Sequence, residues 1–347
     1  MIDFTSTLDN YTGDLMELIR AFHLRTDKDF SLHLDYNVDG DRMSVSLKLS
    51  GEIEREYTYN YTIVFSDEME RKRLEKRHLK EAIYNTIVDY IGVELPYGCL
   101  TGIRPTKLFR ELGERARDMF ENEFSVSKNK VDLVEKIVKV QEPIRNDGDG
   151  YDVFVFIPFC PTRCLYCSFT SHPIGKYIKI VDKYLELLEA ELRTVVPVLL
   201  QKGYNIESLY IGGGTPSSLS IKQLEKLFDI LKIFKLDNAE ITFEANSEDL
   251  TKEKLEFLKN KINRLSIGIQ TFNPKYLKVL GRSINIDNIK EAKNYFNNIN
   301  IDLMYNFKDQ SLKEVKQDID EILELDVSHI STYSLILEKN TKLYIDG

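Results

Sequence analysis

The sequence has few cysteines and no long apolar run. Four of its 347 residues are cysteine, and no segment approaches the ~18 consecutive apolar residues that a membrane-spanning helix requires. The first residues, MIDFTSTLDNYTGD, contain neither the basic stretch nor the apolar core of a secretory signal. We therefore expect a cytoplasmic protein without a membrane span. Disulfides are rare in that compartment, where clustered cysteines more often bind metal or do chemistry.

An excess of positive charge is also absent. The chain has 47 Lys and Arg against 56 Asp and Glu, and this net charge of −9 argues against general nucleic-acid binding. One basic run stands out, RKRLEKRHLK at residues 71–80. Leu79, Ile83, Ile87 and Ile91 continue it at i,i+4 spacing, which predicts a helix with one solvated, charged face.

The pattern of the sequence changes near residue 150, after the linker-like segment QEPIRNDGDG. Residues 1–148 predict a small α+β domain with a helix from Leu15 to Phe22, strands MSVSLKLSG and EYTYNYTIVF in an antiparallel sheet, and helices near 69–91, 106–115 and 128–141. Residues 149–347 alternate helical segments with six apolar strands. This alternation predicts an α/β fold with a parallel sheet, whose ligands bind at the C-terminal ends of the strands.

Three cysteines follow the first of these strands in the segment IPFCPTRCLYCSF. Cys160, Cys164 and Cys167 have C-x3-C-x2-C spacing, and a short loop can turn three such thiolates toward one point. They suit a [4Fe–4S] cluster with one open iron, or a zinc site with His172 as its fourth ligand. A CLYC redox pair would leave Cys160 unexplained, and incidental core thiols are the remaining alternative. Cys99 is expected to be a small buried apolar residue.

Other residues suited to a site lie at or near the ends of later strands. The segment YIGGGTP, residues 210–216, either lets the backbone approach a ligand closely or is a plain glycine-rich turn, and it fits neither the dinucleotide-binding nor the P-loop pattern. Glu244, Gln270, Arg282 and Asp302 follow. Inward-pointing carboxylates on strands need partners. Arg282 and Asp302 could therefore be ligand-binding residues, or they could simply form an ion pair with each other at the rim of the sheet.

The cysteine motif, with Tyr166 before its last cysteine, resembles the signature of radical S-adenosylmethionine (SAM) enzymes. The segments IPFCPTRCLYCSF, YIGGGTPSSL, TFEAN, RLSIGIQTFNPKYLKVLGR, INIDLMY and HISTYSLILEKNTKLY resemble, in this order, the oxygen-independent coproporphyrinogen III oxidase family and its haem-chaperone relatives. The resemblance covers about residues 150–345, and TGIRPTKLF resembles the N-terminal extension of the coproporphyrinogen dehydrogenase branch. It implies a partial (β/α)6 barrel after the small α+β domain.

The resemblance also implies cofactors, a reaction and partners. Cys160, Cys164 and Cys167 would hold a [4Fe–4S] cluster, and SAM would bind its open iron. The implied SAM-binding residues are Tyr166, Gly213, Gly214, Thr215, Glu244, Gln270, Arg282 and Asp302, with the glycines at the methionyl amine, Glu244 and Gln270 at the ribose and Arg282 at the methionyl carboxylate. The implied reaction is oxidative decarboxylation of coproporphyrinogen III propionates in haem biosynthesis, with flavodoxin or ferredoxin as electron donor. The alternative is a haem-binding delivery protein on the same scaffold.

The sequence departs from the family pattern at three places. Phe154 and Phe156 replace Tyr and His, Ser168-Phe169 replaces Gly-Cys, and Asn-Phe-Lys-Asp at residues 306–309 replaces Gly-Leu-Pro-Gly. These departures bear on coproporphyrinogen decarboxylation more than on SAM cleavage. The chain ends at Gly347, so we expect the C-terminal domain of the family to be absent.

One basic motif lies outside the barrel. The GIRPTK segment, with Arg104, Lys107 and Arg110 near a helix start, is either a surface turn between domains or a clamp for propionates.

Overall fold

The computed structural model describes residues 2–7, 11–23, 25–145, 150–203 and 205–346. The chain divides into two compact units, Met1–Asn146 and Asp147–Gly347, each with its own hydrophobic core. Residues 146–149 of the expected linker, which include the expected boundary at 148, lie outside the described residues. In the described part of the chain, no helix has the length and apolar character needed to cross a membrane.

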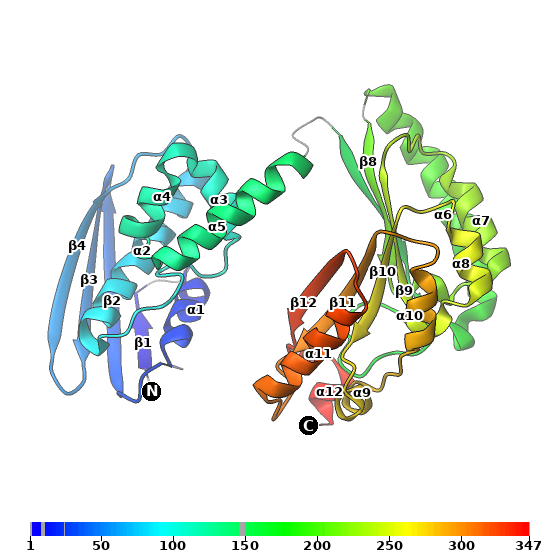
Figure 1. Ribbon diagram of the computed structural model, residues 1–347. Coiled ribbons are helices and arrows are strands. Elements are labelled where there is room, and N and C mark those ends of the chain that lie inside the picture. The colour runs from blue at the N-terminus through cyan, green and yellow to red at the C-terminus, as the bar shows by residue number, and fades with distance from the viewer. Residues whose placement is uncertain (1, 8–10, 24, 146–149, 204, 347) are drawn as a thin grey trace. The chain divides into compact units, whose positions relative to one another are not determined.

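The first unit contains a four-stranded sheet in the order β1-β2-β3-β4 (Figure 1). Its strands are β1 (Ile2–Ser6), β2 (Phe30–Asp39), β3 (Arg42–Ser50) and β4 (Arg55–Thr62). The β2-β3 and β3-β4 pairs are antiparallel, as predicted for the segments MSVSLKLSG and EYTYNYTIVF, whereas the edge strand β1, which the sequence did not predict, runs parallel to β2. The cause is helix α1 (Thr12–His23), which joins β1 to β2 and gives the chain the length that a parallel crossover needs.

The other helices of this unit are α2 (Glu68–Ile91), α3 (Pro105–Leu112), α4 (Ala116–Asp118) and α5 (Lys128–Gln141). Leu79, Ile83 and Ile87 of α2 are fully buried, as their spacing predicts. The prediction that the charged face of α2 is solvated is correct for Lys72 and Arg73, which are exposed, but wrong for Glu75 and Lys80, which are only 5% and 6% exposed. The chain after α2 folds back over this face, and the Lys80 ammonium donates to the hydroxyl of Thr101 at 2.8 Å.

The second unit contains a six-stranded parallel sheet in the order β5-β8-β9-β10-β11-β12, which confirms the predicted α/β fold (Figure 1). Its strands are β5 (Tyr151–Ile157), β8 (Ile206–Gly213), β9 (Glu240–Asn246), β10 (Arg264–Gln270), β11 (Ile299–Tyr305) and β12 (His329–Ser334). A two-stranded pair, β6 (Phe159–Cys160) and β7 (His172–Pro173), begins just after β5. The sheet is a row with β5 and β12 at its edges, as expected of a partial barrel.

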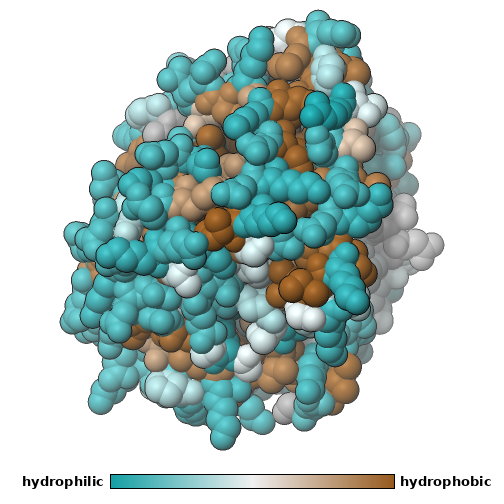
Figure 2. All heavy atoms as spheres, turned by 90° about the vertical axis from the view of Figure 1, so that its right-hand side faces the viewer, coloured by the Kyte–Doolittle hydropathy of each residue, from teal (hydrophilic) through white to brown (hydrophobic). Residues whose placement is uncertain are grey.

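Seven helices are described in the second unit: α6 (Ile174–Gln201), α7 (Ile221–Leu231), α8 (Lys252–Leu258), α9 (Pro274–Leu280), α10 (Ile286–Ala292), α11 (Leu312–Glu324) and α12 (Lys342–Ile345). Helices α6, α7 and α8 lie on the same side of the sheet (Figure 1). The face that they present is mostly hydrophilic, with apolar atoms in separate patches (Figure 2). The apolar strands pack against the inner faces of these helices, which leaves the strand ends available for a site.

Phe243 on β9 lies at the centre of this packing. It is fully buried, and its ring stacks on that of Phe228 from α7 with 6.3 Å between centroids. We predict that Phe243→Ala lowers the opening free energy of β8, β9 and β10 by about 3–5 kcal/mol, because it removes a buried ring and leaves a cavity. Hydrogen exchange measured by mass spectrometry checks this, with peptides from β2 and β3 as the internal control. Unchanged protection of the second unit would contradict the packing described.

Candidate functional site

A cavity of about 270 Å³ lies at the C-terminal ends of the parallel strands in the second unit. The sequence predicted eleven site residues in this unit, and all of them line the cavity: Cys160, Cys164, Tyr166, Cys167, Gly213, Gly214, Thr215, Glu244, Gln270, Arg282 and Asp302. They come from five separate segments of the chain. The parallel sheet therefore gathers residues that are up to 142 positions apart, from Cys160 to Asp302, around one space.

The cysteine loop is held at both ends. It begins where Phe159 and Cys160 pair with β7, and the Leu165 amide donates to the carbonyl of Leu280 at the end of α9, at 3.0 Å. The three thiols are free and partly exposed. Burial and then the neighbouring thiols of Cys164 and Cys160 raise the pKa of Cys167. A soft, positively charged group would reverse this effect by stabilising the thiolates, so the donor set fits an iron–sulfur cluster.

The expected zinc alternative has less support from the position of its fourth ligand. His172 lies on β7, exposed, with its ring 4.9 Å from that of Tyr177, and it does not line the cavity. In the part of the chain that the structure describes, no group of three or more His, Cys, Asp or Glu side chains is arranged to hold a single metal ion.

The glycine turn after β8 approaches the cysteine loop backbone to backbone. The Gly214 amide donates to the carbonyl of Ile157 at 2.8 Å, and the Thr215 amide donates to that of Phe159 at 2.6 Å. A Cβ atom on Gly214 would lie 2.5 Å from the Phe159 oxygen, and Gly213 has a φ of +107°. Only glycine fits these two positions, so the turn can bring bare backbone to the cavity wall.

The carboxylate of Glu244 has two partners on the neighbouring strand β8. Its oxygens accept from the Tyr210 hydroxyl at 2.6 Å and from the Gly213 amide at 2.9 Å. Burial raises the pKa of Glu244, and both hydrogen bonds oppose that rise. Sequence analysis predicted that this carboxylate needs a partner but did not identify Tyr210. Tyr210 stands in the same YIGGGTP segment as the glycines.

The carboxylate of Asp302 is held in a similar way. It accepts from the Asn300 amide at 2.8 Å and from the Tyr333 hydroxyl at 3.0 Å, and burial raises its pKa. Sequence reasoning missed both partners. Asn300 stands two positions before Asp302 on the same face of β11, but Tyr333 belongs to β12 and is recognisable only once the strand pairing is known.

Arg282 does not form the ion pair with Asp302 that was considered as an alternative. Among the described residues it has no ion pair. Its guanidinium donates to the Cys164 sulfur at 3.4 Å and to the carbonyl of Gly268, while its Nε is buried without a partner. A buried N–H group without a partner is costly, so this donor is suited to an acceptor that enters the cavity.

The end of β10 is irregular at Gln270. Its φ is +79°, which is rare for a residue other than glycine, and the register with β11 shifts between Gly268 and Gln270. Such a bulge redirects a side chain at the end of a strand, and backbone strain of this kind is concentrated at functional sites. Gln270 is 8% exposed and lines the cavity.

One departure from the family pattern keeps its backbone shape. Asn306 and Asp309 replace the two glycines of that segment, and both have positive φ values, of 68° and 60°. Asn and Asp tolerate this conformation better than other residues with side chains. Phe307 between them packs with Tyr276, and Tyr166 of the cysteine loop packs against the same apolar cluster.

Comparison with known proteins gives a consistent picture. Residues 154–322 match the radical SAM superfamily. The haem chaperone HemW of Bacillus subtilis is 39% identical over 200 residues, which are 55% of this chain and 52% of HemW. The oxygen-independent coproporphyrinogen-III oxidase-like protein HemZ of the same organism is 28% identical over 338 residues, 91% of this chain and 67% of HemZ.

Among solved structures, coproporphyrinogen III oxidase (HemN) of Escherichia coli is 26% identical with a TM-score of 0.52, over 60% of this chain and 50% of that one. This chain thus spans about half the length of HemW and of HemN. The matched residues 154–322 include all eleven predicted site residues that line the cavity. Residues 154–322 thus match a superfamily whose cofactors are a [4Fe–4S] cluster and SAM, and the chain is similar to the HemN-like proteins of that superfamily, which include the haem chaperones.

Proposed function

We propose that Cys160, Cys164 and Cys167 hold the [4Fe–4S] cluster, that SAM binds beside it in the same cavity, and that the protein binds haem as a chaperone of this family does. The observation that carries the proposal is the gathering of eleven expected residues around one cavity. When bound, the cluster supplies an electron to the sulfonium of SAM. The protein supplies binding, orientation and exclusion of water.

Each end of SAM has a suitable partner on the cavity wall. The fork of Arg282, with its unpartnered Nε, suits the methionyl carboxylate, because a guanidinium can bind both oxygens of a carboxylate. The bare backbone of Gly213, Gly214 and Thr215 suits the methionyl amine. Glu244 and Gln270 suit the ribose hydroxyls and Asp302 the nucleoside, since a carboxylate with two partners keeps lone pairs for further donors.

Two observations support the haem-binding function over oxidative decarboxylation. HemW proteins of several bacteria are 29–39% identical to this chain, whereas HemN is 26% identical. Phe169, where the well-characterised oxidase has Cys, is 66% exposed and lines the cavity. Exposed aromatic rings can stack on a flat, apolar ligand but cannot transfer protons.

Decarboxylation of coproporphyrinogen remains the second candidate, because HemZ matches through both units of this chain. Each propionate would then give one hydrogen atom to the 5′-deoxyadenosyl radical derived from SAM, lose carbon dioxide and pass the remaining electron to an acceptor, which leaves a vinyl group. That reaction would use an electron donor such as flavodoxin or ferredoxin to reduce the cluster, whereas in a haem-binding protein the cluster would serve a regulatory or structural purpose.

The first test concerns the cluster ligands. Anaerobically reconstituted protein is expected to contain about four irons per chain and a similar amount of sulfide. Replacing Cys160, Cys164 or Cys167 by Ala should abolish this content, because each removes one of three thiolate ligands. Cys99→Ala is the control, since Cys99 is 2% exposed in the other unit and should leave the iron content unchanged. Stoichiometric zinc in iron-replete protein would contradict the assignment.

The second test concerns SAM. Arg282→Ala should weaken SAM binding by about 1.5–3 kcal/mol, the range for a hydrogen bond to a charged group, and Arg282→Lys should recover part of the loss. Isothermal titration calorimetry of the reconstituted protein measures this. Arg163→Ala is the matched control, because Arg163 is an exposed arginine of the cysteine loop that does not line the cavity. Equal affinity in all four proteins would rule out the proposed role of Arg282.

The third test separates the two candidate functions. Haem added to the reconstituted protein is expected to change its Soret absorption until about one haem per chain is bound, and Phe169→Ala should weaken that binding because it removes an exposed ring. Phe65→Ala, at an exposed phenylalanine of the first unit, is the control. Vinyl products formed from coproporphyrinogen with one 5′-deoxyadenosine each would instead favour the decarboxylase.

A further inference from the structure

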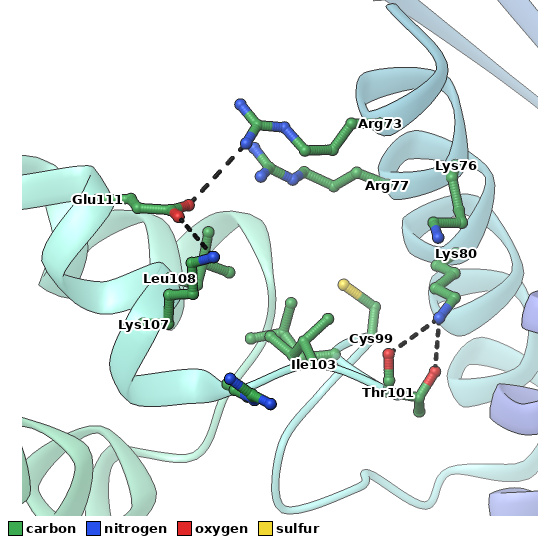
Figure 3. A pocket seen from close by; sticks show the side chains of 12 residues that line it. Arg73, Lys76, Arg77, Lys80, Cys99, Thr101, Ile103, Lys107, Leu108 and Glu111 are labelled. Atoms are coloured by element: carbon green, nitrogen blue, oxygen red, sulfur yellow. Dashed lines mark hydrogen bonds and ion pairs between the residues drawn. The ribbon is translucent and has the colours of Figure 1, made fainter. Parts of the chain in front are cut away.

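A second cavity, of about 350 Å³, lies within the first unit (Figure 3). Helix α2 forms one wall, and the segment from Cys99 to Glu111, which includes GIRPTK and α3, forms the other. Six basic residues line it against one acidic residue, Glu111: Arg73, Lys76, Arg77, Lys80, Arg104 and Lys107. The two basic motifs of the sequence, 31 positions apart from Arg73 to Arg104, thus meet at one place.

Four of these cations come from a single face of α2. Arg73, Lys76, Arg77 and Lys80 are spaced by three or four residues, and like charges at i,i+4 repel. Lys76 forms an ion pair with Asp14 at 3.3 Å, and Arg73 forms two, with Glu70 at 3.8 Å and with Glu111 at 3.9 Å. Glu111 is also shared with Lys107 at 3.8 Å. The positive charge on this wall is therefore only partly balanced.

Arg77 is the least balanced of the four. Across the described residues it has no hydrogen bond and no ion pair, and its guanidinium lies over the ring of Phe124 with 5.1 Å to the centroid. Burial and then the charge of Arg73 lower its pKa, but an arginine remains charged in proteins. Figure 3 shows Arg73 and Arg77 extending side by side from α2 toward α3. A half-buried charge without a counter-ion here is suited to an anion that enters the cavity.

The rest of the lining is apolar and uncharged. Leu100, Ile103 and Leu108 contribute aliphatic groups. Cys99 is 2% exposed, and burial raises the pKa of its thiol to about 12, so it is a neutral part of the wall. The cavity of about 350 Å³ has room for a small ring with an acidic group.

We propose that this cavity binds a small organic anion, with a phosphate or carboxylate group at Arg77, Arg73 and Arg104 and an apolar body against Ile103 and Leu108. A guanidinium recognises both kinds of acid by paired hydrogen bonds. The site is contained in the first unit and does not depend on the cluster or on SAM, so it can be tested apart from the function of the second unit.

The experiment is calorimetric titration of the full chain with phenyl phosphate, benzoate, inorganic phosphate and benzyl alcohol as probes. Phenyl phosphate or benzoate is expected to bind at one site at least tenfold more tightly than inorganic phosphate or benzyl alcohol, because only they combine charge with an apolar ring. Preference for phenyl phosphate would identify phosphate esters as the natural class, and preference for benzoate would identify carboxylates.

Variants locate the site. Arg77→Met should weaken binding of the preferred probe at least tenfold, because it removes the guanidinium that the anion would contact. Arg104→Gln, at an exposed position, should also weaken binding and provides the test if Arg77→Met fails to fold. Lys72→Met is the matched control, since Lys72 is an exposed residue of the same basic run outside the cavity.

Two outcomes would overturn the proposal. One is that no probe shows saturable binding, or that Arg77→Met and Arg104→Gln bind like the native chain. The other is that a short single-stranded oligonucleotide binds while the small anions do not, and that Arg77→Met and Lys72→Met weaken it equally. That result would indicate a diffuse polyanion surface in place of a cavity.

Discussion

The site in the second unit depends on one close approach between two stretches of backbone. The amides of Gly214 and Thr215 donate to the carbonyls of Ile157 and Phe159, which tie the end of β8 to the start of the cysteine loop. The amide of Gly213 donates to Glu244 and adds β9 to the same connection. A side chain on Gly214 would collide with the Phe159 carbonyl. The cysteine loop can therefore lie this close to the ends of β8 and β9 only because residue 214 is glycine.

Most of the second unit could be predicted from the sequence, because its signals are local. Six apolar strands alternate with helices, and a parallel sheet brings their C-terminal ends to one edge, so residues at those ends meet. Tyr333 could not be predicted as the partner of Asp302, because that contact depends on pairing between two strands. The first unit was harder for the same reason. The parallel pairing of β1, and the chain that covers the charged face of α2, are long-range features that a periodic pattern does not contain.

Buried charged groups in this molecule are of two kinds. Glu75 in the first unit is 5% exposed. Its carboxylate forms an ion pair with Arg71 at 2.8 Å and accepts a hydrogen bond from the Tyr11 hydroxyl at 3.1 Å. Such an arrangement stabilises an ion within the protein itself. Arg282 and Arg77, in contrast, each lie at a cavity with donors that the described residues do not satisfy. A buried arginine with unsatisfied donors lowers the free energy of unfolding. A ligand that supplies the missing acceptors binds to these donors and raises the stability of the folded protein.

The family resemblance and the departures from it concern different parts of the molecule. The backbone is kept even where the sequence changes, since Asn306 and Asp309 hold the positive φ values that glycines would otherwise supply. The change at Phe169 places an apolar ring at the cavity that the cysteines line. An apolar ring can stack on a flat ligand, but it offers no group with which to orient propionates or move protons. This difference is one reason for proposing haem binding ahead of decarboxylation.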